Sequence, residues 1–328
     1  MADNSMKKKK TKFIFTVAVS GGLGKSISAS LITETLRLPV QDDLKVIAVT
    51  CDPDHQDLAA RYGQKDDDNL LVPYDQQDLF KGVQFIDFSD PEIRENQFKK
   101  LFSYKADFVV VDFGAGQVSS FDQLFGDIEK FKQFIKFAGL DITFVCPVKD
   151  EQTLIEFNNL VNVFGKSVRF IMAFNEGLLK ATKTISTDKK NALINTINGM
   201  AVEKFTIKET FTEEIISGLA DHSFRELFTP RIERQVLDDD EDFVYVSDDN
   251  DYLLQDMNSQ FILDNVLTLT THQINGLFGL PQPYKEEIEE EIDKFWFIVL
   301  SLKCPERGIL ILFKPIDNFN YYDILVIS

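Results

Sequence analysis

The feature that most constrains this chain is a short apolar segment that runs directly into a glycine-rich turn and then a helical pattern. Residues 12–19 are rich in β-branched and aromatic side chains, which predicts a buried parallel strand. Gly21, Gly22 and Gly24 follow, and the apolar spacing over 26–36 predicts a helix. A strand, a glycine turn and a helix N-terminus together form a phosphate-binding arrangement.

The turn also carries the side chains that a triphosphate site needs. Lys25 is expected to reach the β- and γ-phosphates and to serve catalysis, and the Ser26 hydroxyl is expected to bind Mg²⁺. The alternative is an ordinary glycine turn with a solvent-facing lysine, which the flanking strand and helix disfavour. The general pattern G-x-x-x-x-G-K-[ST] is incomplete, because Val19 stands where it requires glycine. The predicted nucleotide-binding residues here are Gly21, Gly22, Leu23, Gly24, Lys25, Ser26 and Ile27.

The string instead resembles K-G-G-x-G-K-[ST], the deviant P-loop of the ParA/MinD partition and positioning ATPases. The signature lysine of that family falls on Ser20. In the family this lysine reaches across a nucleotide-sandwiched dimer to the partner's phosphates. The resemblance, which covers about residues 12–235, implies ATP or ADP and Mg²⁺ as cofactors and a nucleotide-dependent homodimer. The missing lysine implies slow hydrolysis.

Two further predicted strands deliver aspartates to the same edge of the sheet. The segment after residues 45–50 resembles the D-x-D-P-Q switch of the family. Asp52 matches its second aspartate, which helps to position the attacking water near Mg²⁺, and Thr50 replaces the first. An alternative for Asp52 is a capped turn that starts a short helix. Residues 107–112 resemble a Walker B strand, with Asp112 as a Mg²⁺ ligand, and the backbone N–H of Gly114 matches a γ-phosphate sensor.

The second half of this region resembles the part of the family fold that walls the base pocket. Residues 141–148 predict a strand that contains Pro147, and a helix over 152–164 follows. The strand over 168–174 ends at Asn175, which the resemblance assigns to hydrogen bonding with the purine. The alternative is an Asx turn before Gly177.

Charge and cysteine content limit the partners and the compartment. The net charge of −18 argues against a surface that coats DNA, although a local basic patch could contact it. The basic segments at 7–10 and 180–190 are expected to be solvated. Three separated cysteines suit reduced thiols in a cytoplasmic protein. No apolar run approaches the roughly 20 residues that span a bilayer, so no membrane span is expected.

The predicted fold class is α/β, a doubly wound, mostly parallel sheet of the P-loop NTPase type with a small α+β appendage at the C-terminus. The appendage is expected to contain helices at 260–277 and 284–294 and strands at 295–303, 308–313 and 323–327. Its apolar strands suggest a protein partner. The expected divisions are a basic, flexible N-terminus (1–11), the nucleotide-binding domain (12–237), an acidic linker (238–255) and the appendage (256–328).

The function that this pattern favours is a slow, nucleotide-dependent switch ATPase. Within the family, the strings VVVDFGAGQVSSF and FNEG are similar to the TraL-like proteins of plasmid conjugation, which implies plasmid partition, transfer or cargo positioning. The alternative is a non-hydrolysing adaptor that binds nucleotide for structure and recruits partners through the appendage. A metabolic ligase or kinase on the same fold would need a small-substrate pocket, which no segment marks.

Overall fold

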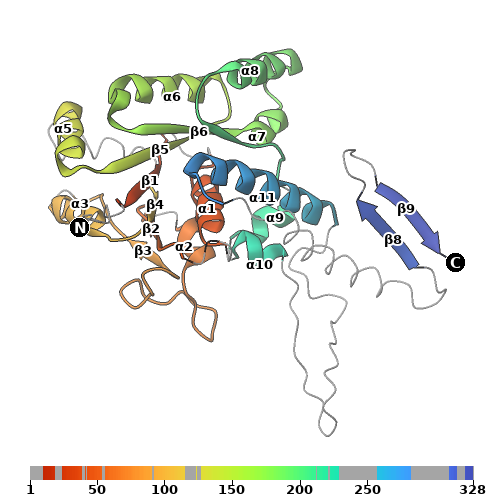
Figure 1. The fold of residues 1–328 in the computed structure, drawn as a ribbon, viewed down its shortest axis with the longest axis horizontal. Coiled ribbons are helices and arrows are strands. Elements are labelled where there is room, and N and C mark those ends of the chain that lie inside the picture. The colour runs from red at the N-terminus through yellow and green to blue at the C-terminus, as the bar shows by residue number, and fades with distance from the viewer. Residues whose placement is uncertain are drawn as a thin grey trace, which may run out of the picture. The chain divides into compact units, whose positions relative to one another are not determined.

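The chain folds into two compact units, residues 1–280 and residues 281–328 (Figure 1). The structure is a computed structural model. It describes residues 10–18, 24–38, 41, 43–53, 56–90, 92–114, 123, 127–211, 213–220, 222–228, 257–281, 310–315 and 322–327.

The first unit is built on a seven-stranded sheet with the order β3-β2-β4-β1-β5-β6-β7, in which every pair is parallel. Helices cover both faces, so the central strands are buried on both sides and consist almost wholly of apolar residues. The prediction of a doubly wound, mostly parallel α/β sheet is confirmed. The strands are β1 (Lys12–Thr16), β2 (Val46–Thr50), β3 (Val83–Phe85), β4 (Phe108–Asp112), β5 (Asp141–Val148), β6 (Arg169–Asn175) and β7 (Lys204–Ile207).

One face of the sheet carries a core rich in phenylalanine. The rings of Phe15 and Phe144 meet edge to face with 6.0 Å between their centroids, a favoured geometry for aromatic pairs. Phe131 and Ile135 of α5 are buried here, whereas Phe137 is 95% exposed. The helices on this face are α3 (Arg94–Ser103), α5 (Ile128–Ala138), α6 (Glu151–Phe164), α7 (Glu176–Ala181) and α8 (Thr187–Gly199).

The opposite face is centred on α1, which is covered by the sheet on one side and by α11 on the other. Ten of the twelve residues of α1 are buried, among them Thr33, Glu34 and Thr35. The Thr35 and Thr271 hydroxyl oxygens lie 3.4 Å apart and join α1 to α11. The helices on this face are α1 (Lys25–Leu36), α2 (Asp57–Tyr62), α9 (Glu213–Gly218), α10 (Phe224–Phe228) and α11 (Met257–Phe278).

Helix α11 belongs to the first unit, which corrects the expected start of the appendage at residue 256. The Gln273 side-chain oxygen accepts a hydrogen bond from the backbone N–H of Thr206 on β7, at 2.7 Å. Arg169 on β6 donates to the carbonyl oxygen of Leu277 at 2.6 Å and pairs with Glu203. Because these contacts fix α11 to the sheet, the boundary between the units falls after Leu280.

The second unit contains an antiparallel hairpin of β8 (Leu310–Pro315) and β9 (Tyr322–Ile327), close to two of the strands expected there. Four expected segments lie outside the described residues: the helix at 284–294, the strand at 295–303, the acidic linker, and all but the last two residues of the basic N-terminus.

Among the helices that the structure describes, none combines the length and the apolar character needed to cross a membrane.

The basic segment 180–190 is more ordered than the expected solvated loop. Lys180 lies in α7, and both Lys189 and Lys190 lie in α8. The Lys190 ammonium donates to the carbonyl oxygen of Lys180 at 2.7 Å, so this lysine ties the end of α7 to the start of α8.

Replacing Arg169 with alanine is expected to lower the free energy of unfolding by about 2–3 kcal/mol. The change removes a charged donor from the end of α11 and leaves the Leu277 carbonyl without this partner. Urea denaturation would measure the loss. Lys99→Ala is the control, because the Lys99–Glu95 pair is two-thirds exposed and should contribute little to stability. Equal stability of the two variants would contradict the proposed role of Arg169.

Candidate functional site

The candidate site lies at the carboxyl edge of three neighbouring strands of the sheet. Thr16, Asp112 and Thr50 end β1, β4 and β2, and the sheet register aligns them side by side. The chain leaves β1 through α1 on one face of the sheet, and α5, the first helix after β4 whose bounds the structure describes, lies on the other face. Ligands of open α/β sheets bind where such connections diverge, so this edge is the expected binding crevice.

Asp112 is the most unusual group at this edge, because its carboxylate is buried and incompletely satisfied. It is 2% exposed, and its Oδ1 accepts a hydrogen bond from the Thr16 hydroxyl at 3.1 Å. Its Oδ2 has no hydrogen-bond partner among the described residues, and neither does the hydroxyl of Thr50 beside it. A buried polar atom without a protein partner can be satisfied by a water or a bound ion, and a carboxylate oxygen suits a hard cation.

The pKa of Asp112 is raised to about 6, chiefly because burial removes the carboxylate from water. Ser26, Lys25 and Thr16 act in the opposite direction, and the charge of Asp57 adds to the rise. Lys25 and Ser26 therefore lie close enough to stabilise the carboxylate. The structure thus brings together the three residues that the sequence assigned to phosphate and Mg²⁺.

Lys25 and Ser26 take this place because α1 begins immediately after Gly24. Gly24 has a φ of 91°, a left-handed conformation that glycine adopts without strain. Lys25, the first helical residue, is only 9% exposed. The Ile27 side chain packs against the core of the α1 face. Any role of Ile27 in nucleotide binding therefore falls to its backbone N–H. Gly21, Gly22, Leu23 and Ser20 lie outside the described residues.

Asn175 lies beside the start of α1, although it is distant in sequence. It caps α7, since its Oδ1 accepts a hydrogen bond from the backbone N–H of Leu178 at 3.0 Å. The oxygen therefore caps a helix and bonds one residue beyond Gly177, where the Asx turn of the alternative would have bonded. If Gly24 carried a Cβ, that atom would lie 3.3 Å from the Asn175 Nδ2. The amide donor is therefore close to the predicted loop. Pro147 lies near the end of the neighbouring strand β5 and pairs with Ala173.

Asp52 and Gly114 also lie at this edge. The backbone N–H of Cys51 donates to the carbonyl oxygen of Asp112 at 3.0 Å, which brings the end of β2 to the end of β4. Burial raises the pKa of the Cys51 thiol, and the charges of Asp112, Asp87 and Asp52 raise it further. These three carboxylates therefore lie within electrostatic reach of the thiol. Gly114 follows Asp112 by two residues, and the segment 115–122 lies outside the described residues.

The described residues hold no cluster of three or more His, Cys, Asp or Glu side chains that could form a metal cage. Mg²⁺ commonly takes one or two carboxylates from the protein and completes its shell with phosphates and water. Asp112 and Ser26 have the oxygen atoms for such a site.

Two residues at this edge were not predicted as site residues. Thr16 orients the Asp112 carboxylate, and Thr50 was noticed only as a substitution. The alternation of a single strand does not reveal which residue of another strand lies beside it, so the pairing of Thr16 with Asp112 had no sequence signal.

Comparison with known proteins gives structural neighbours but no sequence family. A scan of family models finds no match, and no curated protein matches at a significant level. A nucleotide-binding protein from Archaeoglobus fulgidus in complex with ADP is 12% identical, with a TM-score of 0.39 over 65% of this chain and 86% of that one. A plasmid partition protein from Borrelia burgdorferi is 14% identical, with a TM-score of 0.38 over 65% of this chain and 96% of that one.

A third neighbour is a putative plasmid partition protein from Borrelia burgdorferi B31 bound to AMPPNP. It is 14% identical, with a TM-score of 0.39 over 62% of this chain and 88% of that one. All three TM-scores lie below 0.5.

Replacing Asp112 with asparagine is expected to stabilise the protein without ligands. In the folded state the pKa of Asp112 is about 6 instead of 3.8, so the folded state binds more protons between these values and loses stability as the pH rises. The asparagine amide carries no charge, so the variant avoids this loss of stability, and the amide oxygen can still accept the hydrogen bond from Thr16. The gain should reach up to about 3 kcal/mol at pH 8 and fall to about half at pH 5.

Urea denaturation of both proteins at the two pH values, without nucleotide or Mg²⁺, would measure the difference. Thr143→Val, a buried change on β5 that removes no charge, should shift stability by the same amount at both pH values. A pH-independent effect of Asp112→Asn would show that the carboxylate is not strained by burial.

Proposed function

We propose that this chain binds a purine nucleoside triphosphate with Mg²⁺ at the carboxyl edge of β1 and β4 and is a slow switch ATPase of the ParA/MinD type. The observation that carries the proposal is the buried Asp112 carboxylate, whose Oδ2 has no hydrogen-bond partner among the described residues, next to Lys25 and Ser26. Burying a carboxylate lowers the stability of the protein, and such costly burial is expected where the carboxylate binds a ligand.

The proposed roles follow from the chemistry of each group. Lys25 supplies positive charge to the phosphates, and the Ser26 hydroxyl and the Asp112 carboxylate hold Mg²⁺. Bound Mg²⁺ neutralises phosphate charge. Asp52 orients the attacking water, and the backbone N–H of Gly114 donates to the γ-phosphate. Asn175 keeps an amide donor beside Gly24 for the nucleotide, while its oxygen caps α7.

Slow turnover follows from two substitutions. Ser20 replaces the signature lysine of the family, so the charge that would cross the dimer interface is missing unless Lys149 or a partner residue supplies it. Thr50 replaces the first aspartate of the switch and places a neutral, fully buried hydroxyl next to Asp112. The site therefore carries less charge than the family pattern.

The loss of the signature lysine at Ser20 also favours a second candidate, a non-hydrolysing adaptor that binds nucleotide for structure. Single-turnover assays with ATP and with GTP separate the two functions. The ATPase predicts slow phosphate release that Asp52→Ala abolishes. The adaptor predicts tight binding without release and no effect of Asp52→Ala.

The cellular process is proposed from the resemblance alone. It is plasmid partition, conjugative transfer or the positioning of another cargo, with a nucleotide-dependent homodimer and a protein partner at the C-terminal unit. DNA contact remains the less favoured alternative, because the net charge is −18. Measurement of the mass in solution with each nucleotide tests the dimer.

Lys25→Ala is expected to weaken nucleotide binding about 10- to 100-fold, the usual effect of losing a charge-assisted hydrogen bond. Ser26→Ala should instead remove most of the benefit of added Mg²⁺ and leave Mg²⁺-free binding close to that of the wild type. Fluorescent ATP and GTP analogues, titrated with and without Mg²⁺, would measure both effects.

The control is Lys166→Ala. Lys166 is exposed and precedes β6, so it lies at the opposite, amino edge of the sheet. The proposal fails if the wild type binds neither nucleotide, or if Lys25→Ala and Lys166→Ala bind equally well.

A further inference from the structure

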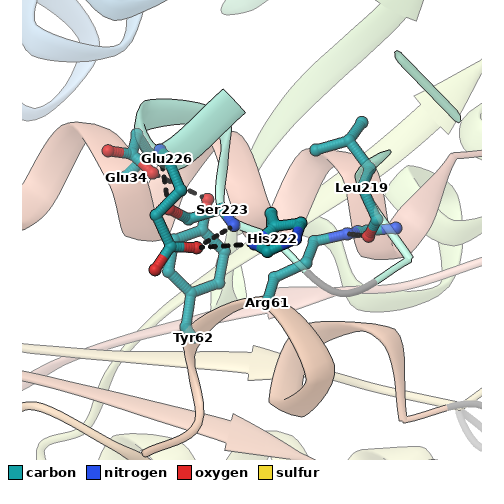
Figure 2. A network of polar contacts seen from close by, with 7 residues as sticks. All are labelled: Glu34, Arg61, Tyr62, Leu219, His222, Ser223 and Glu226. Carbon is teal, nitrogen blue, oxygen red and sulfur yellow. Dashed lines mark hydrogen bonds and ion pairs between the residues drawn. The ribbon is translucent and has the colours of Figure 1, made fainter. Parts of the chain in front are cut away.

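Helix α2 is attached to two other parts of the first unit through the half-buried side chain of Arg61. The Arg61 Nε donates to the carbonyl oxygen of Leu219 at 2.6 Å, and its Nη1 donates to the Ser30 hydroxyl at 3.0 Å. Figure 2 shows the guanidinium group pointing from α2 toward the Leu219 carbonyl. One side chain thus connects α2, α1 and the turn that ends α9.

The next residue strengthens the attachment of α2 to α1. The Tyr62 hydroxyl lies 2.9 Å from the Glu34 Oε2 (Figure 2). It also lies 3.2 Å from the carbonyl oxygen of Ser30. Burial and the nearby charge of Glu34 raise the pKa of Tyr62, so the hydroxyl keeps its proton and remains a donor. Because Ser30 is fully buried, these contacts are protected from water.

The turn at Leu219 is itself held firmly. Ser223 and Glu226 form a capping box at the start of α10, in which the Ser223 N–H donates to the Glu226 carboxylate at 2.7 Å and the Glu226 N–H donates to the Ser223 hydroxyl at 3.2 Å. His222 lies 3.8 Å from the same carboxylate (Figure 2). A displacement of Arg61 would therefore be transmitted to an ordered corner.

The other end of α2 belongs to the candidate site. The helix begins at Asp57, which follows Asp52 closely in the chain, and α1 begins at Lys25. Burial lowers the pKa of Arg61, and the charges of Asp57 and Asp112 oppose that effect. The guanidinium group is therefore within electrostatic reach of two carboxylates at the site, although it bonds to neither.

We infer that Arg61 is a positioning residue of the candidate site, which fixes the segment with Asp52 and Asp57 against α1 and connects nucleotide binding to the α9–α10 corner. This inference rests on the proposed function. The corner is defined as residues 215–220 and 222–227. By reciprocity, nucleotide binding should order the corner, and loosening the corner should weaken binding of the triphosphate.

The test compares Arg61→Met with Arg169→Met in the full chain. Both changes remove an arginine that donates to a backbone carbonyl at 2.6 Å, so both should lower stability, but Arg169 lies at the amino edge of the sheet, away from the site. Arg61→Lys tests for rescue by charge. Ser30→Ala is a milder change that removes only one acceptor and still reports on the same connection.

Two measurements are made on each protein with Mg²⁺ and either ADP or a non-hydrolysable ATP analogue. The first is nucleotide affinity, and the second is hydrogen exchange of the corner. In the wild type, the ATP analogue should slow exchange at the corner. Arg61→Met should abolish this protection and weaken binding of the analogue about tenfold, with a smaller effect on ADP. Ser30→Ala should show part of both effects, Arg61→Lys should recover part of them, and Arg169→Met should show neither.

Unchanged protection in Arg61→Met, or no protection in a wild type that binds the analogue, would overturn the inference and leave the proposed function intact. Equal effects of Arg61→Met and Arg169→Met would also overturn it, since they would reflect lost stability alone. A wild type that binds no nucleotide would overturn the proposed function, and the inference with it.

Discussion

The burial of α1 on both sides is the constraint on which the rest of the first unit depends. A helix between a sheet and another helix has no solvent-facing side, so its polar residues must find partners inside the protein. Thr35 meets Thr271, Glu34 meets Tyr62, and Ser30 meets Arg61 and Tyr62. These contacts fix the helix in position and orientation, and they therefore place Lys25 and Ser26 at its first turn next to Asp112.

Stability and function oppose each other at the carboxyl edge of the sheet. Asp112 lies at the end of a central strand, where burial raises its pKa and only one of its oxygens has a hydrogen-bond partner within the described part of the chain. An apolar residue would pack there without this penalty. The surrounding core of phenylalanine and valine is large enough to tolerate the loss, so the strained carboxylate persists within a stable sheet.

Much of this arrangement could be predicted from the sequence, because buried parallel strands are continuous apolar runs and their carboxyl ends meet at one edge. Lys25, Ser26 and Asp112 were identified in this way. The place of α11 was not, because α1 and α11 form contacts between residues far apart in the chain, and an acidic run separates α11 from the strands. Register and interior hydrogen bonds, such as those of Thr16 and Arg61, also had no local pattern.

The hydrogen bond between Gln273 and Thr206 has a consequence for how the chain reaches its native state. It joins residues 67 positions apart, and it occupies a backbone N–H on the outermost strand of the sheet. In a nascent chain that has emerged only as far as β7, this edge strand is exposed and can pair with a strand of another molecule. Helix α11 is synthesised last in this unit, so the Thr206 N–H gains its partner only after the rest of the sheet has been made.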